Sequence, residues 1–227
     1  MINKNSMKTP VRAIVTGVTG MVGEGVLHEC LQDSAVEAVL VITRKPSGAS
    51  HPKLKEIIHA DFFDLTPIQN QLTGYNACFF CLGVSSVGMK EAEYTKMTYT
   101  LTMHVATILA KQNPGMTFCY VSGAGTDSTE SKGMWARVKG KTENDLFKLP
   151  FKQAIAFRPG FMLPTPGLKN VLPFYKYVNW MFPVSRKLFP KYFCTLAEVG
   201  QAMIHTVTVG TDKKILEVPD IVALAHA

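Results

Sequence analysis

Three glycines near the start of the chain have the spacing of a turn that binds a dinucleotide. Gly17, Gly20 and Gly23 follow a short apolar run at 11–15 and precede a helical pattern, which is the context that such a turn requires. Gly17 allows a tight turn, Gly20 lets the backbone approach a pyrophosphate, and Gly23 lets the helix pack against the strand. The N–H groups and the dipole of the helix favour an anion there. The spacing therefore predicts a dinucleotide site; the alternative is an ordinary glycine-rich loop.

The second apolar run, at 36–42, ends in cations at the place where a dinucleotide fold selects its cofactor. An acid at this place would accept a hydrogen bond from the ribose 2′-hydroxyl of NAD. The chain has Thr43, Arg44 and Lys45 instead. A guanidinium and an ammonium suit a 2′-phosphate better, so the sequence predicts NADP as the cofactor. The alternative is a solvated basic turn.

One cysteine pair has a spacing that suggests a redox or metal site, but we expect no such site, and no hydrolase site, among the cysteines, histidines and serines. Cys78 and Cys81 form a CxxC within the apolar run 77–82. Residues three apart on a strand point to opposite faces, so we expect both thiols to pack in the core. The six histidines show no paired-ligand spacing, and no metal is expected. Ser122 lies in no GxSxG elbow and has no histidine placed to activate it, which disfavours a hydrolase.

The elements that position these residues alternate between strands and helices as far as Gly160. This pattern predicts an α/β fold, a Rossmann-type doubly wound parallel sheet with helices on both faces. Ligands bind at the carboxyl ends of such strands, so we expect Asp61 and Phe62 to contact the adenine and Gly83 to lie beside the cofactor. Predicted strands cover 11–15, 36–42, 54–60, 77–82, 116–121 and 152–157, and predicted helices follow Gly23 and cover 67–72, 90–112 and 135–147.

Beyond Gly160 the alternation stops, and residues 161–193 are rich in aromatics, prolines and cations. We expect this segment to cover the cofactor cleft as a substrate lid or to form a contact in a homodimer; contact with a membrane surface is an alternative. Aromatics among cations can also bind nucleic acid, but no nucleic-acid motif accompanies them. A capping-box spacing at Thr195 and Glu198 predicts a returning helix, and a last strand at 214–218 closes the sheet. The cations are Lys169, Lys176, Arg186, Lys187 and Lys191.

Length and composition predict one domain over 1–227, with a core at 11–160, a lid region at 161–193 and a returning helix and strand at 195–218. A chain of 227 residues that is 47% hydrophobic can bury a full core. The net charge of +7 suits a phosphorylated cofactor, an acidic partner or a membrane surface. Five scattered cysteines, a polar start at 1–10 and the absence of a long apolar run predict a cytoplasmic protein without a transmembrane helix.

These motifs resemble those of the short-chain dehydrogenase/reductase superfamily, in its atypical and extended branch. The segments VSGAGTDS, VKGKTENDL and FRPG are most similar to the small Tat-interactive oxidoreductase-like proteins. The resemblance covers 11–160, with weaker support at 195–218. It implies contacts to the pyrophosphate, the 2′-phosphate, the adenine, the nicotinamide ribose and the carboxamide. The implied cofactor-binding residues are, in chain order, Thr16, Gly17, Thr19, Gly20, Met21, Val22, Gly23, Arg44, Lys45, Asp61, Phe62, Cys81, Leu82, Gly83, Lys139, Arg158, Pro159 and Gly160.

The chemistry of that superfamily uses a serine, a tyrosine and a lysine, the last two as Tyr-x-x-x-Lys on one helix. Ser122 matches the serine that orients a substrate carbonyl, and Lys139 matches the lysine that holds the ribose. Trp135 stands in the place of the tyrosine, and an indole cannot act as a general acid or base. The resemblance implies an NADP-dependent oxidoreductase or epimerase for a small molecule, with these three catalytic positions and a proton from water or substrate. The alternative is a non-catalytic NADP-binding sensor or regulatory scaffold.

Overall fold

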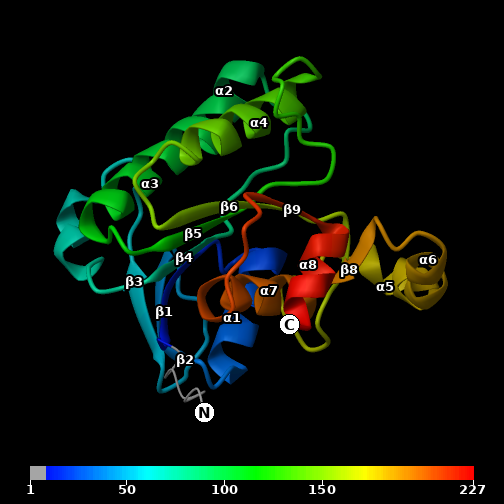
Figure 1. The fold of residues 1–227 in the computed structure, drawn as a ribbon, viewed down its shortest axis with the longest axis horizontal. Coiled ribbons are helices and arrows are strands. Elements are labelled where there is room, and N and C mark those ends of the chain that lie inside the picture. The colour runs from blue at the N-terminus through cyan, green and yellow to red at the C-terminus, as the bar shows by residue number, and fades with distance from the viewer. Residues whose placement is uncertain (1–8) are drawn as a thin grey trace, which may run out of the picture.

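A seven-stranded parallel sheet forms the centre of the computed structural model (Figure 1). The structure describes residues 9–227, apart from the side chains of Lys176 and Val178; residues 1–8, where we expected no targeting signal, lie outside this range. The strand order is β3-β2-β1-β4-β5-β6-β9. The strands are β1 (Val11–Thr16), β2 (Val36–Thr43), β3 (Leu54–Ile58), β4 (Ala77–Phe80), β5 (Thr117–Val121), β6 (Gln153–Arg158) and β9 (Ile215–Glu217).

Helices cover both faces of the sheet, which confirms the predicted doubly wound α/β fold (Figure 1). A parallel sheet must be covered in this way because its crossover connections carry the helices. On one face lie α1 (Met21–Gln32), α7 (Leu196–Thr208) and α8 (Val218–Ala225). On the other lie α2 (Glu91–Thr95), α3 (Leu101–Gln112) and α4 (Met134–Leu146).

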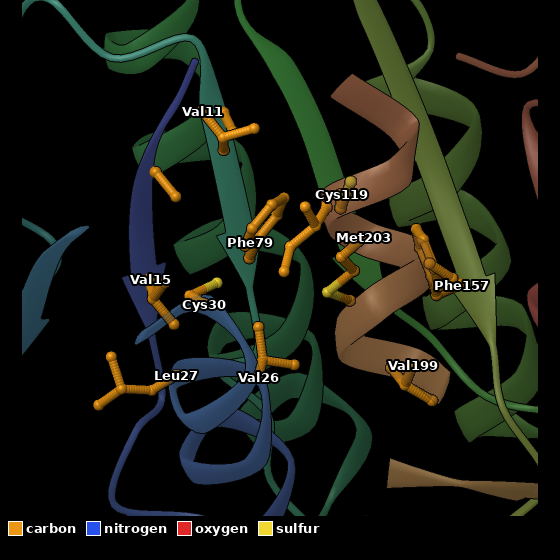
Figure 2. Packing of buried hydrophobic residues seen from close by; sticks show 14 of the residues in the cluster. Val11, Val15, Val26, Leu27, Cys30, Phe79, Cys119, Phe157, Val199 and Met203 are labelled. Carbon is orange, nitrogen blue, oxygen red and sulfur yellow. The ribbon is translucent and has the colours of Figure 1, made fainter. Parts of the chain in front are cut away.

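Apolar side chains fill the two layers between the helices and the sheet. Figure 2 shows Val26 of α1 and Met203 of α7 packed against Phe79 and Phe157 of the central strands. Burial of each such side chain stabilises the fold by about 1.5–3 kcal/mol. Cys78 belongs to the core on one face, and Cys81 packs against the core on the other face. The CxxC therefore serves packing, as the alternation along a strand predicted.

The long helix that we predicted at 90–112 is interrupted by one π-helical turn. This turn, η2 (Lys96–Thr100), lies between α2 and α3 and accommodates an extra residue in the helical path. The hydroxyl of Thr102 donates to the carbonyl of Thr98 at 2.6 Å, a local bond that a threonine offers the backbone. Two other predicted bounds also change: the third strand ends at Ile58, and the helix at 67–72 is a 3-10 helix, η1 (Thr66–Gln71).

The segment after β6 contains a second, two-stranded parallel sheet that the sequence did not predict. Its strands, β7 (Phe161–Leu163) and β8 (Phe193–Thr195), are too short to show an alternating pattern. Between them lie α5 (Tyr175–Val178), η3 (Asn179–Met181) and α6 (Phe182–Leu188). The capping box at Thr195 is present, and β9 pairs with β6, as predicted. Within residues 9–227, no helix combines the length and the apolar character needed to cross a bilayer.

Candidate cofactor and active site

The glycine turn after β1 is shaped by close contacts that a side chain would prevent. Gly17 has a φ of 74°, and a Cβ there would lie 2.6 Å from the carbonyl carbon of Cys81. A Cβ on Gly23 would lie 2.2 Å from the carbonyl oxygen of Gly17. These glycines therefore let the start of α1 approach both β1 and the end of β4. The geometry matches the tight-turn and close-packing roles that the spacing predicted for Gly17 and Gly23.

Two cavities open at the carboxyl ends of the strands, beside the point where the sheet reverses its order. The chain passes from β1 outward to β2 and β3 and then returns to β4 on the other side of β1. A crevice at such a reversal is the usual ligand site of an open α/β sheet. One cavity has a volume of about 260 Å³ and the other about 460 Å³, and Leu82 and Gly83 line both.

The smaller cavity brings together the residues predicted to bind the adenosine end of the cofactor. Arg44, Asp61 and Phe62 line it, together with Leu82 and Gly83. The buried hydroxyl of Thr43 donates to the carbonyl of Lys45 at 2.8 Å and holds the turn that carries Arg44. Lys45, also predicted to bind the cofactor, is exposed and does not line the cavity.

The larger cavity brings together the glycine turn and the residues predicted at the nicotinamide end. Ser122, Lys139 and Pro159 reach it from three different loops or helices. Parallel strands end at the same edge of the sheet, so residues far apart in sequence meet there. Thr16 and Thr19 do not line this cavity. The complete lining is Gly20, Met21, Val22, Gly23, Cys81, Leu82, Gly83, Ser85, Val121, Ser122, Lys139, Pro159, Met162 and Leu172.

Lys139 supplies the cation of the larger cavity. Its Nζ donates to the carbonyl of Val121 at 3.2 Å and lies 5.1 Å from the ring centroid of Tyr120. Desolvation lowers the pKa of Lys139 from its ordinary value of 10.5 to about 8, and the charge of Glu143 opposes this shift. The amine therefore titrates close to neutral pH, as groups in reactive sites often do.

Tyr120 is a neighbour of Lys139 that the sequence did not reveal. Its hydroxyl lies 3.5 Å from Nζ of Lys139, but the side chain is fully buried and does not line the cavity. Burial raises the pKa of Tyr120 far above its ordinary value. The phenol thus positions the ammonium and is a poor proton donor for a ligand. No spacing could have paired them, because Tyr120 lies on β5 and Lys139 on α4.

Ser122 and Trp135 both belong to the surroundings of the glycine-rich turn at 122–125. Ser122 is buried, and its hydroxyl shares a 3.0 Å hydrogen bond with that of Thr126. The indole of Trp135 covers the turn: a Cβ on Gly125 would lie 3.7 Å from its Cη2 atom. Trp135 does not line the larger cavity. Ser122 therefore lines the cavity, whereas the indole packs on the glycine-rich turn.

Arg158 was predicted to lie at the carboxamide, but its guanidinium is held in a buried ion pair. It donates to the carboxylate of Glu143 at 2.5 and 3.1 Å, to Glu217 at 3.2 Å and to the hydroxyl of Ser128 at 2.6 Å. Pro159 lines the cavity, whereas Arg158 and Gly160 do not. The guanidinium therefore pairs with carboxylates outside the cofactor crevice, and these contacts connect α4, β6 and β9.

Part of the 161–193 segment lies beside the larger cavity. Leu172 lines the larger cavity, and the backbone N–H groups of Lys169 and Asn170 donate to the Glu24 carboxylate at 2.8 and 2.7 Å. The helices that follow, α5 and α6, project away from the sheet (Figure 1). In the described part of the chain, no group of three or more histidine, cysteine or acidic side chains is placed to hold a metal.

Comparison with known proteins identifies relatives of the same fold. Residues 13–132 match the model of the NAD dependent epimerase/dehydratase family. Protein FMP52, mitochondrial, of Debaryomyces hansenii is 27% identical over 199 residues, 85% of this chain and 86% of that protein. The Bordetella bronchiseptica enzyme WbmF, solved with NAD+, is 15% identical with a TM-score of 0.63 over 97% of this chain and 78% of WbmF. A short chain dehydrogenase family protein from Francisella tularensis is 18% identical with a TM-score of 0.59 over 90% of this chain and 93% of its own.

These relatives correct one prediction and confirm another. The predicted cytoplasmic location is wrong, because the Debaryomyces hansenii relative is named as a mitochondrial protein. The resemblance to the short-chain dehydrogenase/reductase superfamily is confirmed by the shared fold and by the family match, which covers more than half of the sequence. The chain belongs to the NAD dependent epimerase/dehydratase family.

Proposed function

We propose that the chain binds NADP across both cavities and acts as an oxidoreductase or epimerase-like enzyme on a small molecule. One observation carries the proposal: Arg44 lines one cavity, Ser122 and Lys139 line the other, and the two cavities meet at Leu82 and Gly83. NADP carries a 2′-phosphate at one end, which requires a cation as its partner, and a reactive nicotinamide ring at the other. The arrangement of polar groups fits both ends.

The residues around the crevice fit the cofactor part by part. The tight approach at Gly17 and Gly23 leaves the N–H groups at the start of α1 for the pyrophosphate. Arg44 would hold the 2′-phosphate, and Asp61 and Phe62 would contact the adenine. The cofactor would supply a hydride when bound.

Ser122 and Lys139 would prepare a substrate oxygen for that chemistry. The Ser122 hydroxyl donates a hydrogen bond to the oxygen, and the ammonium of Lys139 stabilises negative charge that develops nearby. Tyr120 keeps the ammonium in place from behind. Because Trp135 offers no titratable proton, the proton comes from water or from a group of the substrate.

A second function is favoured by the identity of residue 135. The indole of Trp135 packs on the glycine turn, and the nearby phenol of Tyr120 is buried with a raised pKa. Neither group is suited to proton transfer. A protein with this site would bind NADP and signal its presence to a partner without turnover.

The cofactor part of the proposal is tested by comparing NADPH and NADH affinities by calorimetry. We expect NADPH to bind at least about tenfold more tightly, a difference of about 1.4 kcal/mol. Arg44→Ala removes the guanidinium and should erase most of the preference without weakening NADH binding. Arg12→Ala is the matched control, because Arg12 lies at the opposite end of β1 and pairs with Glu37. Equal affinities in the unmutated protein would contradict the NADP assignment.

A further inference from the structure

Two short helices between β7 and β8 carry a large exposed apolar surface. They are held to the body by their inner side, where Tyr175 and Phe182 are 5% and 6% exposed. Both rings pack on Phe161, with centroids 5.1 and 6.3 Å away, and Phe182 also packs on Phe193. These inner contacts hold the helices to β7 and β8.

Exposed apolar side chains recur along the described part of these helices. Tyr177 of α5, Trp180 of η3, and Val184 and Leu188 of α6 follow one another at three- or four-residue steps and are all exposed. Their exposed fractions are 77%, 76%, 62% and 66%. We call this set the outer apolar face; Met181, Phe189 and Tyr192 extend it. Contiguous exposed apolar surface of this kind marks an interaction site.

The outer apolar face is bordered by cations. Lys187 and Lys191 are exposed at its edge. From residue 161 to residue 197 the sequence contains no aspartate or glutamate. Arg186 is paired with Glu198, so Lys187 and Lys191 carry the charge of this border. A second copy of the chain packed face to face would bring like charges together. The charge of the surface instead favours an anionic partner.

We propose that the outer apolar face binds an anionic lipid bilayer at its surface. Trp and Tyr are the side chains that prefer the boundary between headgroups and acyl chains, because each has an apolar ring and a polar tip. Helices lying in this boundary bury their apolar face by about 5–10 Å while nearby lysines contact anionic headgroups. Trp180 already satisfies its indole N–H by donating to the carbonyl of Tyr177 at 2.9 Å, which lowers the cost of burial in lipid.

Vesicle sedimentation tests this proposal. The full chain should bind vesicles of phosphatidylcholine with phosphatidylglycerol and should bind pure phosphatidylcholine vesicles much more weakly. Lys187→Glu with Lys191→Glu should weaken binding to the anionic vesicles by at least about 25-fold, since loss of each cation costs about fivefold. Lys111→Glu with Lys152→Glu makes the same change of net charge at exposed sites near the amino ends of the strands and should have little effect.

The apolar part of the contact is tested by a second pair of variants and by fluorescence. Trp180→Ala with Leu188→Ala should weaken binding to the anionic vesicles, whereas Ile58→Ala with Val87→Ala, at exposed apolar sites elsewhere, should not. In a Trp135→Phe background Trp180 is the remaining tryptophan, and its emission should shift to shorter wavelength with anionic vesicles. All of these substitutions are at the surface or conservative, and circular dichroism checks that the fold is retained.

Three results would overturn the proposal. The first is equal binding, or none, to neutral and anionic vesicles. The second is an equal loss of binding in the two lysine pairs, which would reduce the effect to net charge. The third is a dimer in sedimentation velocity that Trp180→Ala with Leu188→Ala dissociates, because a second copy of the chain would then cover the outer apolar face.

Discussion

Lys139 is the cation of the larger cavity, and its pKa decides the pH range over which it attracts an anionic ligand. Desolvation lowers this pKa to about 8. In the proposed complex a bound pyrophosphate would stabilise the ammonium, so the pKa of Lys139 would be higher than in the empty protein. Binding is then strongest below the lower of the two values and weakens as the pH rises through the higher one. The interaction of two charges is set by their separation and by an effective dielectric constant of about 20.

NADPH affinity should therefore fall as the solution becomes alkaline. We expect binding roughly tenfold weaker at about pH 9.5 than at about pH 7, measured by calorimetry. Lys139→Met keeps the length of the side chain and removes the titrating group, so its affinity should be lower and should not show this step. An unchanged pH dependence in Lys139→Met would assign the titration to another group.

Residue 135 decides whether the site can transfer a proton through the protein. Trp135 stands one helical turn before Lys139, on the face that a Tyr-x-x-x-Lys pair would share. Trp135→Tyr places a phenol near the ammonium, and the positive charge lowers its pKa below about 10. Proton transfer from a positioned group is worth about 10² to 10⁴ in rate. NADPH-dependent reduction of small quinones or aldehydes should be slow or absent in the original protein and measurable in the variant.

Trp135→Phe is the control for this gain of function. It removes the indole without adding a phenol, so it should remain as slow as the original protein. Strong activity in the original protein that survives Trp135→Phe would show another proton source and support the enzyme. Tight NADPH binding without activity in any of the three proteins would support the sensor.

The residue types predicted only part of the site. Gly17 has the positive φ of the tight turn that its spacing predicted, and Arg44 and Ser122 line the two cavities. Arg158 has the same residue type as a cofactor ligand, yet its nearest anions are carboxylates of other elements. The sequence does not show that this guanidinium meets Glu143 and Glu217, because they lie 15 and 59 residues away along the chain. The same reason hid the contact between Tyr120 and Lys139.

At the scale of elements, a buried ion pair holds the helix that carries Lys139. Glu143 of α4 is fully buried and accepts two hydrogen bonds from Arg158 of β6. Removing one partner of such a pair leaves a buried charge without full compensation. Glu143→Gln should reduce the free energy of unfolding by about 3 kcal/mol, measured by urea denaturation.

An exposed ion pair provides the comparison. Glu91 pairs with Arg137 at 2.5 Å, but its side chain is half exposed. Water and salt screen such a pair, so Glu91→Gln should shift the urea midpoint far less than Glu143→Gln does. Similar shifts in the two variants would show that burial does not set the strength of the Glu143 contact.

Long apolar or periodic segments were predictable as elements, and short ones were not. β4 has four buried residues in a row, and α7 begins with a capping box, so both elements can be predicted from the sequence. β7 and β8 have three residues each, and their pairing depends on contacts between segments about 30 residues apart. The π-helical turn η2 adds one residue to the helical path, and the apolar periodicity of the flanking helices does not reveal this extra residue.

At the scale of the molecule, one ligand should connect the two halves of the sheet. Arg44 and Asp61 follow strands on one side of β1, whereas Ser122 and Lys139 belong to the other side. NADPH that occupies both cavities stabilises every segment it touches against local opening. At a concentration of about 100 times the dissociation constant this amounts to about 2.7 kcal/mol, or roughly 100-fold slower hydrogen exchange where exchange requires the ligand to leave.

Hydrogen exchange followed by mass spectrometry should therefore show protection in two separate regions. NADPH should protect both 43–63 and 120–140, whereas adenosine 2′,5′-bisphosphate, which lacks the nicotinamide end, should protect the first region alone. The helices at 175–188 project from the body and serve as the internal control, because their described residues line neither of the two cavities. Protection by NADPH in the first region alone would mean that the two cavities do not form one site, and Ser122 and Lys139 would then act on a different ligand.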